Sequence, residues 1–319
     1  MKQAAKPDSH PFQGVIIEAI TPRRPNETSV DLSATLEMVD FLSESGANAI
    51  ALLGSTGEFV HFSVDDRCHM TDFAVKRSRV PVLVNVSHST LDGAVELADE
   101  AVDSNVVGLL LMPPYYFRYS QQAIRKFYLD FAKSISGPVP IFLYNIPVFT
   151  NELEIATALS LLETGLFAGI KDSSGSWDYF MRLRDHATKY SYTILIGDDS
   201  LFARARACGA HGVVSGTASA VPELMLAIER AVVSEQPDLV RALDGRLREF
   251  IDQISKFPAP MGIKEAAGLR RVKLGVPAIH LSGEEQEQMD RFLAWFEPWL
   301  ATVRTECNLN SKTGRSGER

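Results

Sequence analysis

Residues 141–171 read IFLYNIPVFTNELEIATALSLLETGLFAGIK, two short apolar runs separated by a longer amphipathic segment. The runs at 141–145 and 167–171 predict β-strands buried on both faces, because they show little alternation of apolar and polar residues. The segment 155–163 repeats apolar residues at helical spacing and predicts a helix. A strand, a helix and a second strand in this order form one βαβ unit with parallel strands.

The same alternation of short apolar runs and longer amphipathic segments continues over most of the 319 residues. Further strands are predicted at 14–20, 49–53, 82–86, 108–112, 193–196 and 212–215. Further helices are predicted at 32–45, 64–76, 91–102, 121–135, 177–188, 201–208 and 221–233. Ser63, followed three residues later by Asp66, fits a capping box at the second helix. Eight such units favour an α/β fold of the (β/α)8 TIM barrel type, with an open doubly wound sheet as the alternative.

After Ser234 the strand signals stop, and helices are predicted at 237–256, 262–271 and 284–303. We therefore expect an N-terminal arm (1–11), a catalytic barrel (12–234), a C-terminal helical domain (235–305) and a polar, disordered tail (306–319).

Composition narrows the class of protein. The chain is 45% hydrophobic and 23% charged, as is ordinary for a globular protein. A net charge of −8 argues against a nucleic-acid partner and weakly against an anionic membrane surface. The longest apolar run, at 106–112, is too short to span a bilayer, and residues 1–10 contain no apolar run typical of a secretory signal. Three well-separated cysteines favour a reducing compartment, so we expect a cytoplasmic enzyme.

Two strand ends carry candidate catalytic side chains, at the end of the barrel where active sites form. Lys171 closes an apolar run, so we expect burial to lower the pKa of its amine and leave it nucleophilic, as a Schiff base requires. The alternative is a lysine that reaches solvent or pairs with Asp172. Tyr144 ends the preceding strand, where its hydroxyl could relay protons; the alternative is a buried aromatic with a satisfied hydroxyl.

The turn Gly54-Ser55-Thr56-Gly57-Glu58 follows the second strand and offers two hydroxyls and several backbone N–H groups. Such a turn can hold a carboxylate, although it is also common as plain loop geometry.

The sequence lacks the motifs of other classes of catalytic site. The seven histidines form no metal-ligand pair, and neither Gly-x-Ser-x-Gly nor, after the first strand, Gly-x-Gly-x-x-Gly occurs.

Together, the motifs at 54–58, 115–116, 144–147 and 169–175 resemble those of the dihydrodipicolinate synthase / N-acetylneuraminate lyase family, over about residues 12–303. The resemblance implies a barrel with a helical C-terminal domain, usually a homotetramer. It implies Lys171 as the imine-forming lysine and Tyr144 as the proton relay. Ser55 and Thr56, between Gly54 and Gly57, would bind the 2-oxo acid carboxylate, with Ser55 also in the relay. Tyr116, or Tyr115 because the loop carries an extra proline, would match the tyrosine that reaches into a neighbouring site.

The chain departs from both name-giving enzymes where the second substrate binds. Synthases carry an arginine at the position of Phe149, whose ring cannot pair with a carboxylate. Sialic acid lyases carry an acidic pair where this chain has Asp199 and Ser200, and a serine where it has Gly216. Val214 in the eighth strand is also expected to contact substrate.

The expected function is a Schiff-base lyase that makes or breaks a carbon–carbon bond between pyruvate and an aldehyde. The substrate would be a 4-hydroxy-2-oxo acid or a 2-keto-3-deoxy sugar acid. Because the imine is the electron sink, no metal or organic cofactor is expected. The alternatives are a 4-hydroxy-tetrahydrodipicolinate synthase with its carboxylate contact from elsewhere, for example Arg118, a sugar-acid dehydratase, and a non-catalytic metabolite-binding barrel.

Overall fold

A computed structural model describes residues 12–270 and 272–313 and shows a closed barrel of eight parallel strands in sequence order. The strands are β1 (Gly14–Glu18), β2 (Ala49–Leu52), β3 (Val82–Asn85), β4 (Gly108–Leu111), β5 (Ile141–Asn145), β6 (Gly169–Asp172), β7 (Thr193–Ile196) and β8 (Gly212–Ser215). Since β1 pairs with both β2 and β8, the sheet has no open edge. The predicted (β/α)8 barrel is confirmed, and the open sheet is excluded.

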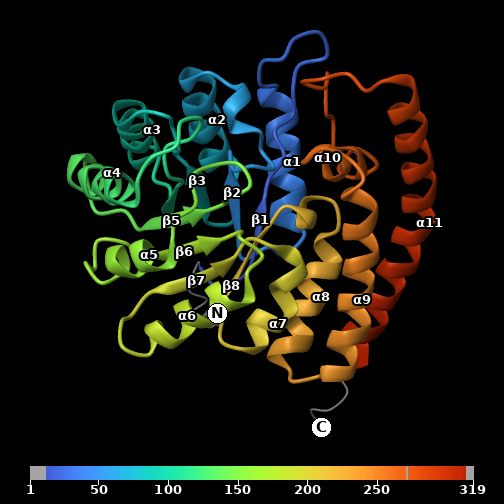
Figure 1. Cartoon of the computed structure of the whole chain (residues 1–319). Coiled ribbons are helices and arrows are strands. Elements are labelled where there is room, and N and C mark those ends of the chain that lie inside the picture. Colours follow the sequence, from blue (N-terminus) through green and yellow to red (C-terminus); the bar gives the residue numbers. More distant parts are fainter. Residues whose placement is uncertain (1–11, 271, 314–319) are drawn as a thin grey trace, which may run out of the picture.

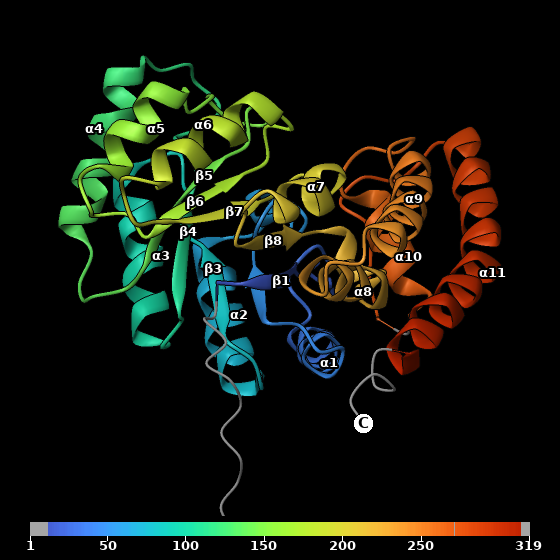
Figure 2. The same ribbon diagram turned by 90° about the horizontal axis from the view of Figure 1, so that it is seen from below.

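Helices surround the strands (Figures 1 and 2). They are α1 (Leu32–Glu44), α2 (Val64–Arg77), α3 (Leu91–Asp103), α4 (Gln121–Ser134), α5 (Ile155–Leu162), α6 (Trp177–Ala187), α7 (Phe202–Ala207) and α8 (Pro222–Val233). Polar side chains cap several of them. Ser63 Oγ accepts a hydrogen bond from the Asp66 N–H at 3.1 Å and donates one to the Asp66 carboxylate, which confirms the predicted start of α2.

The helices α9 (Pro237–Ile254), α10 (Met261–Gly268) and α11 (Gly283–Thr313) lie together on one side of the barrel, beside α8 (Figure 1). Aromatic rings join α9 to α11, with the centroids of Phe250 and Trp299 5.6 Å apart. Among the described residues, no helix is long and apolar enough to cross a membrane.

Most predicted boundaries shift by a few residues, and two of the differences change the interpretation. The segment 306–313, predicted as part of a disordered tail, is helical, because α11 continues past 303 and Glu306 pairs with Arg246 on α9 at 2.7 Å. The strand β6 begins at Gly169 and includes Asp172, so Lys171 lies within the strand and not at its end. The predicted N-terminal arm (1–11) and residues 314–319 lie outside the described residues.

Candidate active site

The side chain of Lys171 points into the barrel and is only 1% exposed. Its ammonium forms an ion pair with the carboxylate of Glu18, which comes from β1, three strands further around the barrel, and is also buried. The Lys171 Nζ lies 3.9 Å from the centroid of the Tyr144 ring, and the two residues are paired across β5 and β6. Lys171 therefore neither reaches solvent nor pairs with Asp172, whose carboxylate accepts a hydrogen bond from Asn145 at 2.8 Å.

The turn after β2 does hold a carboxylate, that of Glu18. Glu18 Oε1 accepts hydrogen bonds from the Thr56 N–H at 2.8 Å and from Ser55 Oγ at 3.2 Å. Gly54 permits this approach, because a Cβ at that position would lie 2.3 Å from Glu18 Oε1. The two donors that the family resemblance assigns to a substrate carboxylate are thus occupied by a carboxylate of the chain itself.

Tyr144 connects to the same group through Ser55. The Tyr144 hydroxyl lies 3.1 Å from Ser55 Oγ. Since the single Ser55 proton is directed at Glu18, the Tyr144 hydroxyl is the donor in this contact. Burial, reinforced by the Glu18 charge, raises the pKa of Tyr144, so its hydroxyl stays protonated near neutral pH. A hydrogen-bonded chain therefore runs from Tyr144 through Ser55 and Glu18 to Lys171.

The protonation of this group differs from the expectation. Burial on its own lowers the pKa of Lys171, but the charges and hydrogen bonds of Glu18 and Tyr144 outweigh it and hold the pKa above its ordinary value. Burial raises the pKa of Glu18, whereas its pairing with Lys171 holds that pKa below its ordinary value. The predicted lowering of the Lys171 pKa is thus wrong. Lys171 is therefore an ammonium paired with Glu18, and an ammonium is not a nucleophile.

Glu18 is the residue that the sequence interpretation missed, although a signal was present. It is the only charged residue in the apolar run at 14–20, which was predicted to be a buried strand. A buried carboxylate is rarely found without a cation or several hydrogen-bond donors. A second buried strand with a charge of the opposite sign, the one that carries Lys171, was the natural partner.

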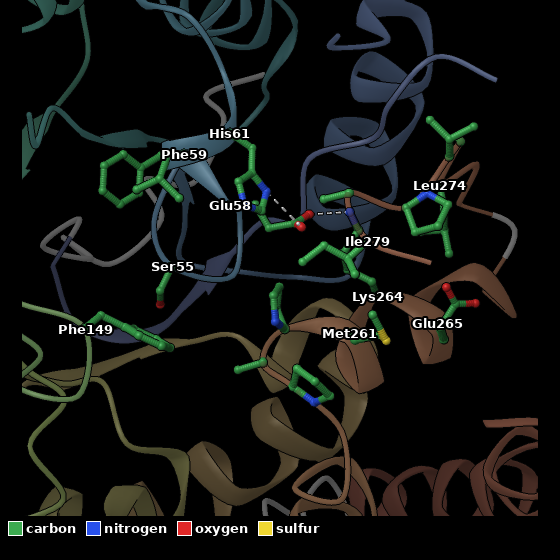
Figure 3. Close-up of a pocket in the computed structure, with 18 of the residues that line it drawn as sticks. Ser55, Glu58, Phe59, His61, Phe149, Met261, Lys264, Glu265, Leu274 and Ile279 are labelled. Carbon is green, nitrogen blue, oxygen red and sulfur yellow. Dashed lines mark hydrogen bonds and ion pairs between the residues drawn. The ribbon is translucent and has the colours of Figure 1, made fainter. Parts of the chain in front are cut away.

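A cavity of about 350 Å³ opens beside Ser55 and extends to α10 and to the loop 274–279. Figure 3 shows Ser55 and Phe149 on one side of this cavity and Leu274 and Glu265 on the other. Phe149 is 54% exposed. Most of the wall is apolar, with contributions from Phe59, Val60, Met112, Phe149, Met261 and Ile279.

A buried charge cluster borders the cavity and ties the turn after β2 to α10. The Glu58 carboxylate forms ion pairs with Lys264 and with Arg23, the latter at 3.3 Å (Figure 3 shows Glu58 and Lys264). Burial lowers the pKa of Lys264 despite this partner. Within residues 12–270 and 272–313, no three His, Cys, Asp or Glu side chains are grouped so that they could hold a metal ion.

The structure brings only part of the predicted set together. Ser55, Thr56 and Tyr144 gather around Glu18 and Lys171, and Phe149 lines the cavity beside them. Tyr116 lies outside this group, is 88% exposed and has a φ of +79°. It is Tyr115 that lines the cavity.

Two further predicted residues do not line the cavity, and neither do Lys171 and Tyr144 themselves. Asp199 accepts a hydrogen bond from the Thr217 N–H at 3.2 Å, and burial raises its pKa to about 6. Val214 is fully buried in β8. Neither side chain lines the cavity described above.

Comparison with known proteins agrees with the barrel fold. The model of the dihydrodipicolinate synthetase family matches residues 11–295. A 4-hydroxy-tetrahydrodipicolinate synthase 1 from Halalkalibacterium halodurans is 28% identical over 283 residues, covering 87% of this chain and 95% of the relative. The structure of the 4-hydroxy-tetrahydrodipicolinate synthase from Methylacidiphilum fumariolicum SolV superposes with a TM-score of 0.83 at 26% identity, covering 92% and 99% of the two chains. The wild-type sialic acid aldolase of Ruminococcus gnavus shares the fold, with a TM-score of 0.84 at 21% identity over 93% and 99%.

Proposed function

Since this chain belongs to the dihydrodipicolinate synthetase family, we propose that it is a class I aldolase in which Lys171 forms a Schiff base with pyruvate or a related 2-oxo acid. The observation that carries this proposal is the buried Lys171 beside the Tyr144 ring, with the Tyr144 hydroxyl linked to Ser55. A lysine kept for stability alone does not need a hydroxyl chain leading to a cavity. The family and this geometry point to the same amine.

The proposed reaction follows from the groups around that amine. Neutral Lys171 attacks C2 of the 2-oxo acid, and the resulting carbinolamine loses water to give an iminium. The iminium draws electrons from the C3–C4 bond, so the bond can break, or the enamine can attack an aldehyde in the reverse direction. Tyr144 and Ser55 move protons between nitrogen and oxygen, and Ser55 and Thr56 bind the substrate carboxylate. The electron sink is the iminium itself, so this route requires no organic cofactor.

The cavity wall supports an aldehyde partner without a carboxylate. Phe149 offers no cation to pair with one, and Lys264, which also lines the cavity, is already paired with Glu58. Arg118, the alternative contact, donates a hydrogen bond to the Thr150 carbonyl oxygen at 3.0 Å and does not line the cavity. These two observations favour 4-hydroxy-2-oxo acid substrates over the condensation of pyruvate with aspartate semialdehyde.

Reductive trapping tests the proposed function. The purified protein is incubated with borohydride and each member of a panel of 2-oxo acids, and its intact mass is measured. We expect pyruvate or a close relative to add the mass of one reduced adduct, because borohydride reduces the imine to a stable amine. The control omits the 2-oxo acid. An unchanged mass with every member of the panel would instead favour a non-catalytic metabolite-binding barrel.

Phe149→Arg tests the choice of aldehyde. We expect this variant to raise kcat/KM for aspartate semialdehyde by about 10-fold or more, since a charge-assisted pair with a carboxylate is worth about 1.5–3 kcal/mol. Phe149→Leu is the matched control and should leave the activity with this substrate low. If the unaltered protein already condenses pyruvate with aspartate semialdehyde robustly, the synthase alternative is correct.

The position of Tyr116 supports a role between subunits. A large aromatic side chain that is 88% exposed, on backbone in the left-handed region, is costly unless something contacts it. The Phe117 ring beside it, with its centroid 4.9 Å away, is exposed as well. We include in the proposal a homo-oligomer, a tetramer by analogy with the family, in which Tyr116 contacts a second copy of the chain.

A further inference from the structure

Glu18 has two sets of contacts that the proposed function does not use. One carboxylate oxygen pairs with the Lys171 ammonium. The other accepts the Thr56 N–H and the Ser55 hydroxyl, the donors proposed for the substrate carboxylate. The Glu18 carboxylate therefore lies where the carboxylate of the substrate is expected to bind.

Two carboxylates cannot share this position. Each donor proton satisfies one acceptor well, and two negative charges at contact distance in a buried site repel each other strongly. The space is also filled, because Glu18 Oε1 lies against Gly54 so closely that even a Cβ there would overlap it. An incoming 2-oxo acid must therefore displace Glu18 from Ser55 and Thr56, or Glu18 must lose its charge.

We propose that Glu18 is a catalytic residue. When the carboxylate of a 2-oxo acid displaces the Glu18 carboxylate from Ser55 and Thr56, Glu18 takes a proton from Lys171. This inference rests on the proposed function. Glu18 Oε2 already contacts the Lys171 Nζ, so the proton moves along an existing hydrogen bond. After the transfer, the buried group holds a neutral Lys171 amine, a neutral Glu18 and one substrate carboxylate. That carboxylate carries the only negative charge of the group and accepts the hydrogen bonds of Ser55 and Thr56. Substrate binding thereby produces the nucleophile.

The same proton serves the second half of imine formation. The Lys171 amine attacks C2, and a proton passes from nitrogen to the former carbonyl oxygen through Tyr144 and Ser55, which gives the neutral carbinolamine. Glu18 then donates its proton to the carbinolamine hydroxyl, the C–O bond breaks and water leaves. The product is a protonated imine beside a Glu18 carboxylate. Protons and charges balance without an external acid or base.

Glu18→Gln separates this role from a structural one. Trapping by borohydride is followed against pyruvate concentration for the unaltered protein and the variant. We expect the half-saturating pyruvate concentration to fall by about 10-fold, since no carboxylate competes for Ser55 and Thr56. We expect the maximal trapping rate to fall by about 100-fold, because the proton acceptor and donor is lost. A loss of packing alone would not improve pyruvate binding.

Asp172→Asn is the matched control. It makes the same change from carboxylate to amide one residue from Lys171, on the opposite face of β6, where Asp172 bonds to Asn145 and Ser174. It should not lower the half-saturating pyruvate concentration. Glu18 has no such role if the Gln variant traps pyruvate at the rate of the unaltered protein. The same holds if its half-saturating pyruvate concentration is unchanged or higher. If the unaltered protein traps no 2-oxo acid, the proposed function itself fails.

A measurement on the unaltered protein remains decisive if the Glu18 variant does not fold. Propionate has the carbon skeleton and carboxylate of pyruvate but no carbonyl to condense. Its binding should produce, in the infrared difference spectrum, the band of one newly protonated protein carboxyl group. Absence of that band at saturating propionate overturns the proposed proton transfer, while adduct formation with pyruvate would still support the aldolase.

Discussion

Lys171→Met should abolish the borohydride-trapped adduct with pyruvate and lower the rate of carbon–carbon bond cleavage by at least about 10⁴-fold. The reason is chemical, because no other group in the described chain presents an amine to the Tyr144–Ser55 hydroxyl pair. Methionine keeps the length and the apolar stem of lysine but cannot form an imine. The measurement is intact mass after trapping, together with the initial rate of pyruvate release from a 4-hydroxy-2-oxo acid.

Lys264→Met is the control for that experiment. Among the described residues, Lys264 is the other buried lysine paired with a buried glutamate, and it borders the cavity beside Ser55. Both substitutions remove a cation from a buried carboxylate, so both should cost stability. Because Glu58 keeps its ion pair with Arg23, the cost for Lys264 should stay below the about 3–5 kcal/mol of a fully unpaired buried charge. Only the Lys171 variant should lose the adduct. The opposite pattern, an adduct that survives in Lys171→Met and disappears in Lys264→Met, would move the imine to α10.

The parts of the structure that could be predicted are those with a local or repeating signal. Apolar runs of strand length alternating with amphipathic segments predicted all eight strands of the barrel, because parallel strands buried on both faces need this composition. Lys171 and Tyr144 could be placed side by side from their equivalent positions in consecutive units, since neighbouring parallel strands bring equivalent positions together.

The parts that could not be predicted depend on contacts between distant segments. Glu18 and Lys171 lie on strands that are not neighbours, and they meet only because the barrel is closed and both side chains point inward. The spacing of the two residues in the sequence does not indicate that contact. Without Glu18 as a partner, only burial was considered, so the shift of the Lys171 pKa was predicted in the wrong direction. The cavity wall likewise combines the barrel loops with α10 and the loop 274–279, and the packing of these segments leaves no periodic pattern.

Tyr144→Phe should slow trapping with pyruvate by about 10²–10⁴-fold while leaving the adduct possible. The phenyl ring still packs against the Lys171 Nζ, so the loss reports the hydroxyl that donates to Ser55. Tyr179→Phe is the matched control, because it removes a buried hydroxyl that donates to the Leu153 carbonyl oxygen at 2.7 Å, outside the site. It should trap pyruvate at nearly the unaltered rate. If Tyr144→Phe did the same, proton transfer would have to run through Glu18 alone, and the hydroxyl chain from β5 would be structural.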